Sequence, residues 1–175
     1  CKHQLALPDL VPIISYLFLR GKCRYCRSPI HYRYPLIELT MAIAFMLVGI
    51  MEPDAVNSVL ISIVAFNLVV IIATDFEQYI IPDSIQAANL ILGIIYSLYK
   101  QTPIFHAFTI ALLMLVIGLM LYFGSKLFFK REGLGIGDVK FMAISGLFLP
   151  LEAISTFFLV SGLVGVITSI FWRFL

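Results

Sequence analysis

Six apolar stretches dominate this chain of 175 residues and restrict it to a small set of folds. They cover residues 36–51, 55–74, 84–99, 104–129, 139–149 and 153–171. Prolines stand at most of the boundaries, where they begin a helix or prevent its continuation, at Pro35, Pro53, Pro82, Pro103 and Pro150. The stretches are continuously apolar rather than alternating, so we expect helices and not the strands of a membrane barrel.

The composition places these helices in a lipid bilayer. Hydrophobic residues make up 61% of the chain and charged residues only 13%, against about 25% charged in a typical soluble domain. Residues 139–149 are too few to cross a bilayer of about 30 Å as one straight helix, which predicts a tilted, bent or re-entrant segment there. The predicted fold class is therefore all-α, a polytopic helical membrane protein, with residues 35–175 as the transmembrane domain.

The basic residues are unevenly distributed among the turns. If successive stretches cross the membrane in alternating directions, eleven of the twelve lysines and arginines lie on one face, and only Lys100 lies on the other. The eleven are Lys2, Arg20, Lys22, Arg24, Arg27, Arg33, Lys126, Lys130, Arg131, Lys140 and Arg173. This asymmetry predicts that their face is cytoplasmic.

Residues 1–34 differ from the rest, and we interpret them as a cytoplasmic, cysteine-rich basic loop. Residues 5–19 are apolar but contain two prolines and an acid, and they are too short to span a bilayer, so we expect an interfacial or packed loop. Cys23 and Cys26 have a spacing that lets two thiolates bind one tetrahedral zinc, and basic neighbours favour the thiolate. A disulfide or two idle thiols are the alternatives. His3 or His31 could supply another ligand.

Two acids stand at the ends of apolar stretches, where a charge is costly and indicates function. Asp75 closes the stretch that ends at Thr74, and Asp138 follows a loop with Gly133, Gly135 and Gly137. Glycine tolerates positive φ and lets other backbone approach closely, so this loop suits a turn that clasps an extended chain. Our hypothesis is that the two acids form one aspartyl-protease pair.

The expected chemistry follows from bringing two carboxylates together. They cannot easily both ionise, so we expect Asp75 and Asp138 to share a proton. One carboxylate then deprotonates a water that attacks the scissile carbonyl, while the other protonates that carbonyl. The alternative for Asp138 is that it only caps a helix.

The other acids have simpler interpretations. We expect Asp83 to be a helix cap or structural residue, and Glu77 to be a polar loop residue facing water. Glu38 is a candidate functional residue, although stabilisation of a helix dipole explains it equally well.

Polar and small residues within the apolar stretches predict contacts between helices. The polar ones are Asn57, Asn67, Gln86 and Asn89, and the glycines expected to allow close approach are Gly118, Gly146, Gly162 and Gly165.

These motifs together resemble one family of membrane proteases. Gly135-Ile136-Gly137-Asp138 resembles the GxGD motif of membrane aspartyl proteases. Ala73-Thr74-Asp75 followed by Ile81-Pro82-Asp83 resembles the first-aspartate region of type IV prepilin peptidases. The basic segment that ends in Tyr34-Pro35-Leu36-Ile37-Glu38-Leu39 resembles the cytoplasmic loop of the same family.

The resemblance implies a function and a location. It implies an endopeptidase in the bacterial inner membrane, with the active site facing the cytoplasm, that removes a short basic leader from prepilins or pseudopilins after a glycine. Gly135 and Gly137 would then lie in the loop that contacts the substrate, and no nucleic acid partner is expected. Many members also methylate the new N-terminal amine with S-adenosylmethionine.

The resemblance also bears on Cys1. The family has two CxxC pairs in its cytoplasmic loop, and Cys1 resembles the end of the first pair, with its partner and at least one more transmembrane helix expected upstream. This implies a structural zinc bound by Cys1, Cys23 and Cys26.

Two other functions stay open at this point. One is a different GxGD protease, of the presenilin or signal-peptide-peptidase type, although the Pro-Asp after Asp75 and the cysteines fit prepilin peptidases better. The other is a membrane transporter whose acids carry protons or cations through broken helices. Against the transporter, both acids lie at one face rather than near the midplane.

Overall fold

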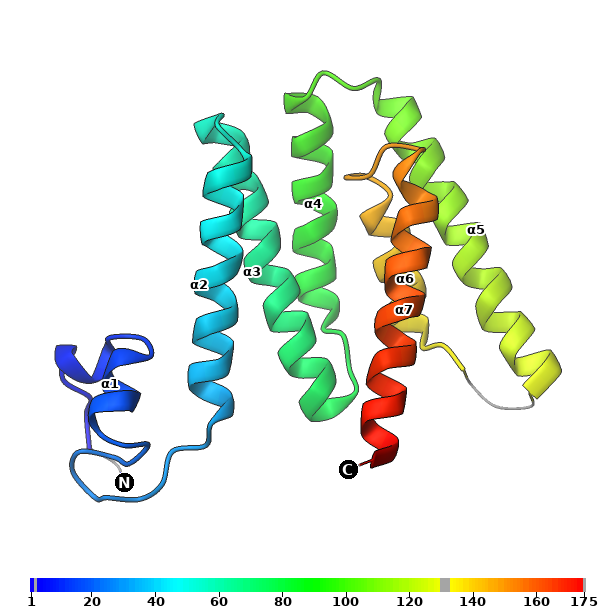
Figure 1. The fold of residues 1–175 in the computed structure, drawn as a ribbon. Coiled ribbons are helices and arrows are strands. Elements are labelled where there is room, and N and C mark those ends of the chain that lie inside the picture. Colours follow the sequence, from blue (N-terminus) through cyan, green and yellow to red (C-terminus); the bar gives the residue numbers. More distant parts are fainter. Residues whose placement is uncertain (2, 130–132, 175) are drawn as a thin grey trace. The chain divides into compact units, whose positions relative to one another are not determined.

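The computed structural model describes residues 1, 3–129 and 133–174. All secondary-structure elements within these residues are helices (Figure 1). Each predicted apolar stretch contains one helix, which confirms the all-α prediction, although residues 146–149 of the short stretch form a turn. The helices are α2 Arg33–Met51, α3 Ala55–Gln78, α4 Asp83–Tyr99, α5 Ile104–Phe129, α6 Ile136–Ser145 and α7 Ala153–Phe174. Of the basic residues counted above, Lys2, Lys130 and Arg131 lie outside the described residues.

Four of the described helices, α2, α3, α5 and α7, are long and apolar enough to cross a membrane. Helix α4 has 17 residues and α6 has 10. At 1.5 Å per residue, α6 is about 15 Å long, half the thickness of the hydrocarbon core. The prediction that the segment after Asp138 cannot cross the bilayer as one straight helix is therefore confirmed, and the chain is a polytopic helical membrane protein.

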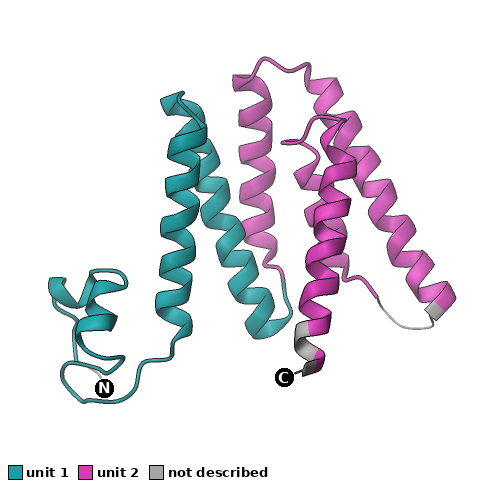
Figure 2. Cartoon of the chain, viewed as in Figure 1, with its two compact units in different colours: residues 1–80 teal, residues 81–175 magenta. Residues whose placement is uncertain are grey.

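The chain divides into two compact units, Cys1–Ile80 and Ile81–Leu175 (Figure 2). In the first unit, α2 packs against α3. The buried residues of α3 include Val69 and Ile71 and the polar Asn57 and Asn67. The amide of Asn57 donates a hydrogen bond to Glu52, which satisfies part of the buried side chain.

Helix α3 continues past the end of its apolar stretch to Gln78. It ends there because Tyr79 adopts a left-handed conformation with φ of 55°. Glu77 therefore lies in the last turn of a helix, and its carboxylate is 2.9 Å from the Arg33 guanidinium at the start of α2. The prediction that Glu77 lies in a loop was wrong, whereas the prediction that it faces water is confirmed, because its side chain is 40% exposed.

The N-terminal segment contains two short helices where a loop was predicted, η1 Leu7–Leu10 and α1 Ile14–Phe18. Pro8 lies in the first turn of η1, and the Asp9 carboxylate accepts the Ala6 N–H at 3.0 Å. The segment is tied to α2 by Glu38, whose carboxylate accepts the Ile13 N–H at 2.7 Å. Ile13 has a φ of 62°, which is unfavourable for a β-branched residue, so this bond holds a strained turn.

In the second unit, α6 packs against both α5 and α4. Met114 of α5 and Val139 of α6 are fully buried. Two of the predicted small residues allow α6 to pack on α5: a Cβ on Gly118 would lie 3.2 Å from the Val139 side chain, and one on Gly146 would lie 2.7 Å from Ala111 Cα. The close-approach prediction is thus confirmed for Gly118 and Gly146.

The same prediction was wrong for the two glycines of α7. No atom lies within 4 Å of a Cβ built on Gly162 or Gly165. The reason is that residues 161–170 are all exposed in the described chain. These glycines therefore make no close helix contact here.

Candidate functional site

Asp75 lies in the last turn of α3, in the first unit. Its side chain is exposed, and its backbone carbonyl accepts the Tyr79 N–H at 2.9 Å in the bond that closes the helix. The preceding Thr74 hydroxyl is occupied, because it donates to the Val70 and Ile71 carbonyls at 3.0 Å. An exposed carboxylate at the end of an apolar helix is the arrangement that the sequence predicted for this acid.

Asp138 lies in the first turn of α6, in the second unit, and is half-buried. Its Oδ2 accepts the Gly135 N–H at 2.9 Å, so the carboxylate does cap the helix, as the alternative interpretation expected. Within the described chain, no group donates a hydrogen bond to its other oxygen, Oδ1. One oxygen therefore fixes the side chain, and the other is left for a water or a substrate.

The glycines beside Asp138 provide space rather than positive φ. Gly135 is extended, with φ of −76° and ψ of 152°, and Gly21 is the one glycine of the described chain with positive φ. A Cβ on Gly135 would lie 3.1 Å from the Asp138 carboxylate, whereas one on Gly137 would lie at an ordinary 3.5 Å from Ile81. Of the two properties of glycine that the sequence offered, positive φ is not used at either position, because Gly135 is an extended N-cap and Gly137 is helical.

Two residues of α4, Asp83 and Gln86, contact the start of α6 next to Asp138. The sequence had predicted only a cap or structural role for Asp83 and a helix contact for Gln86. Gln86 donates from Nε2 to the Gly137 carbonyl at 3.2 Å, and Lys140 Nζ is 2.8 Å from Asp83 Oδ1. Asp83 is the first residue of α4, directly after the N-cap Pro82, and its carboxylate forms this ion pair. The signal in the sequence was Pro82-Asp83 with Gln86 three residues later, but nothing there identified Gly137 and Lys140 as partners.

The three cysteine side chains lie together in the N-terminal segment. Their Sγ atoms are all within 4.8 Å of one another, and those of Cys1 and Cys23 are 3.7 Å apart. All three are free thiols, so the structure does not support a disulfide. Four sulfurs each about 2.3 Å from a zinc ion are about 3.8 Å apart in a tetrahedron. The observed Cys1 to Cys23 distance fits that geometry.

The CxxC turn is closed by backbone hydrogen bonds. The Cys23 N–H donates to the Ser28 carbonyl at 2.9 Å, and the Arg27 N–H donates to the Cys23 carbonyl at 3.0 Å. Hydrogen bonds from the Ser28 side chain and backbone and from Cys23 lower the pKa of the Cys26 thiol to about 6. The local fold thus favours the thiolate, which is the metal-binding form.

Neither histidine joins the cysteines. The His3 ring lies tilted against Tyr25 with ring centroids 3.7 Å apart, and His31 stacks on Tyr32 at 4.4 Å. In the part of the chain that the structure describes, the group of potential metal ligands contains Cys1, Cys23 and Cys26 alone. The prediction that His3 or His31 could complete the site is not supported.

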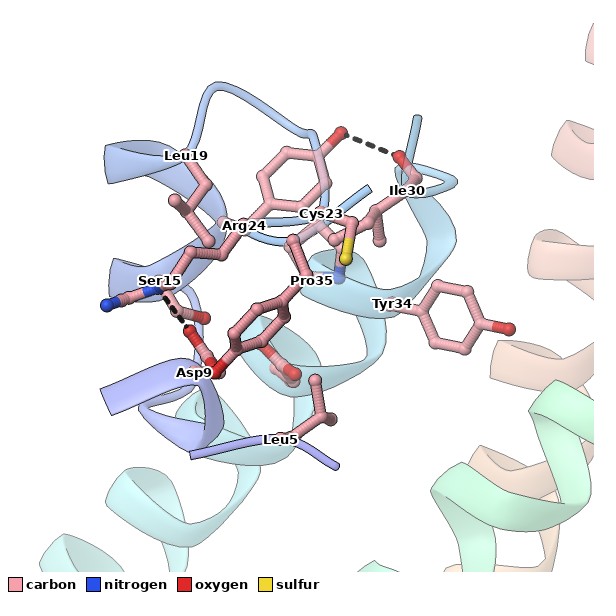
Figure 3. A pocket seen from close by; sticks show the side chains of 12 residues that line it. Leu5, Asp9, Ser15, Leu19, Cys23, Arg24, Ile30, Tyr34 and Pro35 are labelled. Carbon is pink, nitrogen blue, oxygen red and sulfur yellow. Dashed lines mark hydrogen bonds and ion pairs between the residues drawn. The ribbon is translucent and has the colours of Figure 1, made fainter. Parts of the chain in front are cut away.

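A pocket of about 130 Å³ lies beside the cysteine turn, and Cys23 forms part of its wall (Figure 3). Asp9 ion-pairs there with Arg24 at 2.7 Å and accepts the Tyr25 hydroxyl at 3.1 Å. Desolvation raises the pKa of Asp9, but the hydrogen bonds from Ala6 and Tyr25 and the Arg24 charge outweigh it, so the pKa lies below its usual value. These contacts fold the segment and leave Asp9 little capacity for a ligand.

Two family models match the chain. The model for the bacterial peptidase A24 N-terminal domain matches residues 1–51, and the model for the type IV leader peptidase family matches residues 60–170. The second match includes both Asp75 and Asp138. No solved structure matches the chain at a significant level.

Curated proteins named "Prepilin leader peptidase/N-methyltransferase" are similar over most of the chain. The protein from Aeromonas salmonicida (strain A449) is 30% identical over 171 residues, which cover 97% of this chain and 59% of that protein. The protein from Aeromonas hydrophila is 31% identical over 173 residues (94% and 57%), and that from Burkholderia pseudomallei (strain 1026b) is 32% identical over 170 residues (94% and 54%). The chain thus spans a little more than half the length of these relatives.

Proposed function

Since the chain belongs to the type IV leader peptidase family, we propose that it is an aspartyl endopeptidase that removes the short basic leader from prepilins or pseudopilins. The observation that carries this proposal is the family match over residues 60–170, which contains two acids at helix ends. Asp75 lies in the last turn of α3 and Asp138 in the first turn of α6. These are the carboxylates proposed to perform the cleavage.

The mechanism uses one shared proton. One carboxylate takes a proton from a water molecule as that water attacks the carbonyl carbon of the scissile peptide, while the protonated carboxyl gives its proton to the carbonyl oxygen. When the tetrahedral intermediate collapses, the C–N bond breaks, the leaving amine takes a proton from the first acid, and a hydroxyl of the intermediate returns its proton to the second carboxylate as the carbonyl re-forms. The free Oδ1 of Asp138 suits contact with water, since its Oδ2 is held by Gly135.

The substrate would reach the acids as an extended strand. Gly135 is exposed and carries no side chain between the Asp138 turn and an approaching backbone, whereas the corresponding face of Gly137 is covered by Ile81. A basic leader is attracted to the cytoplasmic face of a membrane, and the lysines and arginines of this chain favour that face for the ends of α3 and α6. We therefore place the active site at the cytoplasmic side of the bacterial inner membrane.

N-methylation of the new amine, which the relatives' names include, is a further part of the proposal. The methyl donor would be S-adenosylmethionine. The pocket in Figure 3, at about 130 Å³, is smaller than the roughly 300 Å³ at which ligand pockets begin. It does not fit this donor, so we assign no residue of the chain to methylation.

The peptidase is tested with purified full-length protein and a prepilin in detergent micelles or vesicles. We expect the prepilin to lose its leader, with an N-terminal mass that corresponds to cleavage after the last glycine of the leader. A prepilin with that glycine replaced by a large residue serves as the control and should stay intact. Unchanged mass of the natural substrate, with a known peptidase active in parallel, would contradict the proposal.

We also propose that Cys1, Cys23 and Cys26 hold a structural zinc. The three thiols are clustered and free, and the distance between the sulfurs of Cys1 and Cys23 fits tetrahedral coordination. Zinc bound there would cross-link the N-terminal segment, whose described helices are only four and five residues long. No step of the proposed cleavage involves it.

The zinc site predicts a specific metal content. We expect about one zinc per chain in the full-length protein, and loss of most of it when Cys23→Ser and Cys26→Ser are combined, because a site with two ligands removed cannot hold zinc tightly. The measurement is elemental analysis in reducing buffer without chelator. His31→Ala is the matched control and should keep its zinc, because His31 lies outside the thiol cluster. Metal-free wild-type protein would favour idle thiols.

A further inference from the structure

Gln86 is a buried amide that links α4 to the turn carrying Asp138. Its side chain is 3% exposed, and Nε2 donates to the Gly137 carbonyl across 51 residues of sequence. Gly137 directly precedes Asp138. The first turn of α6 is therefore held from the side by a residue of another helix.

The chemistry of this contact fixes the orientation of the amide. The Gly137 carbonyl can only accept, so the NH2 group of Gln86 must face it. Oε1 is then buried with no hydrogen-bond partner among the described residues, and an unsatisfied buried acceptor costs free energy. An apolar side chain of similar size would avoid that cost. Stability alone therefore does not explain a glutamine here.

Two neighbouring contacts come from the same end of α4. Ile81 packs over Gly137, and Asp83 pairs with Lys140. The ion pair is exposed, with side-chain exposures of 78% for Asp83 and 49% for Lys140, and pairs of this kind contribute little stability. Gln86 provides the buried and directional part of the contact.

We propose that Gln86 is a positioning residue for cleavage: it holds the Gly137–Asp138 peptide so that the Asp138 carboxylate keeps a fixed direction. The inference rests on the proposed function, in which Asp138 is catalytic. Gln86 acts through the backbone and does not itself touch the substrate. A small displacement of a catalytic group slows the chemical step more than it weakens substrate binding.

The first test is Gln86→Leu in the full-length enzyme. We expect kcat for leader removal to fall about tenfold, because one buried hydrogen bond that aligns the turn is lost, while KM changes by less than about twofold. Wild-type kcat in this variant would overturn the inference.

Gln86→Glu tests the same bond through pH. The protonated carboxyl can still donate to the Gly137 carbonyl, whereas the ionised carboxylate cannot donate and repels it. Relative to wild type, we expect cleavage to be better preserved at about pH 5 than at about pH 8. The titratable groups on the packed elements are present in both proteins and cancel in the comparison: Asp83, Tyr96 and Tyr99 on α4, Asp138 and Lys140 on α6, and His106, Tyr122 and Lys126 on α5. A pH profile identical to that of wild type would contradict the role.

Ser97→Ala is the matched control. Ser97 is also buried in α4, and its hydroxyl donates to the Leu147 carbonyl at 3.3 Å, beyond the far end of α6. Ser97→Ala removes a comparable hydrogen bond from α4 to a backbone carbonyl, so its loss of stability can be compared directly with that of Gln86→Leu. Its kcat and pH profile should not change. An equal fall of kcat in Ser97→Ala would show that any loosening of α4 suffices, and would overturn the specific role of Gln86.

Results that contradict the proposed peptidase function differ from results that contradict the role of Gln86. In the first case wild-type enzyme would not cleave, or Asp138→Asn would cleave normally. Hydrogen exchange of residues 133–142 then still reports on the contact: faster exchange in Gln86→Leu than in Ser97→Ala supports the holding role, and equal exchange overturns it.

Discussion

Asp75→Asn and Asp138→Asn are each expected to abolish leader removal, with a fall of about a thousandfold or more in kcat/KM. The reason is that the proposed mechanism needs both carboxylates and one shared proton, and an amide can neither take a proton from water nor return it to the leaving amine. Because the two acids act as one unit, the double variant should be no worse than either single variant. Cleavage is measured by the mass of the prepilin N-terminus after purification of each variant.

Expression and membrane insertion should be preserved in both variants. Asp75 is exposed, and an asparagine at 138 can still accept the Gly135 N–H through its amide oxygen. The fold therefore loses little, and loss of activity can be attributed to the chemistry.

Asp83→Asn is the matched control for a nearby acid. Its carboxylate pairs with Lys140 at an exposed position, where ion pairs contribute about 1 kcal/mol or less. We expect leader removal within a few-fold of wild type. If Asp83→Asn is as inactive as Asp75→Asn, the first catalytic acid has been assigned to the wrong residue. Activity retained by either Asp75→Asn or Asp138→Asn would exclude the proposed pair.

The helices were predictable because hydropathy and proline act locally. The stretch 104–129 coincides with α5, and the stretch 84–99 differs from α4 by one residue. Where hydropathy and backbone hydrogen bonding disagree, the prediction failed. The apolar stretch stops at Thr74, but α3 continues to Gln78 because its backbone bonds persist until Tyr79 turns left-handed. That difference accounts for the error at Glu77.

The candidate site was predictable only in its local parts. Sequence placed Asp75 at the end of one helix and Asp138 at the start of another, because both follow from the boundaries of apolar stretches. The contacts of Gln86 with Gly137 and of Lys140 with Asp83 join residues 51 and 57 positions apart. Their partners depend on how α4 and α6 pack, which single-sequence patterns do not specify.

The contacts of the glycines also depend on tertiary packing, which single-sequence patterns do not specify. Gly118 and Gly146 contact neighbouring helices, whereas Gly162 and Gly165 face open space in the described chain, although all four looked equivalent in the sequence. A glycine in an apolar helix predicts that close approach is possible. Whether another helix uses that space is decided by tertiary packing.

Gly146→Ala is expected to have the largest effect on the fold. A Cβ at this position would lie 2.7 Å from Ala111 Cα and 2.8 Å from Ala111 N. These are backbone atoms of α5, so no change of side-chain rotamer can relieve the clash, and α6 must move away from α5. Overpacking of this kind costs about 3 kcal/mol, which corresponds to a fall of about 10 °C in the melting temperature in detergent.

The displacement should also reach the proposed active site. Gly146 is the C-cap of α6 and Asp138 lies in the first turn of the same short helix, so a helix that shifts as a rigid body carries the carboxylate with it. We expect leader removal to fall about tenfold or more at temperatures where the variant is still folded. Gly162→Ala is the matched control, because the added methyl group meets no atom within 4 Å and alanine favours a helix by about 1 kcal/mol. Its melting temperature and activity should equal or exceed those of wild type. If Gly146→Ala melts and cleaves like Gly162→Ala, then α5 and α6 do not pack as closely as the structure shows, and the position of Asp138 does not depend on that contact.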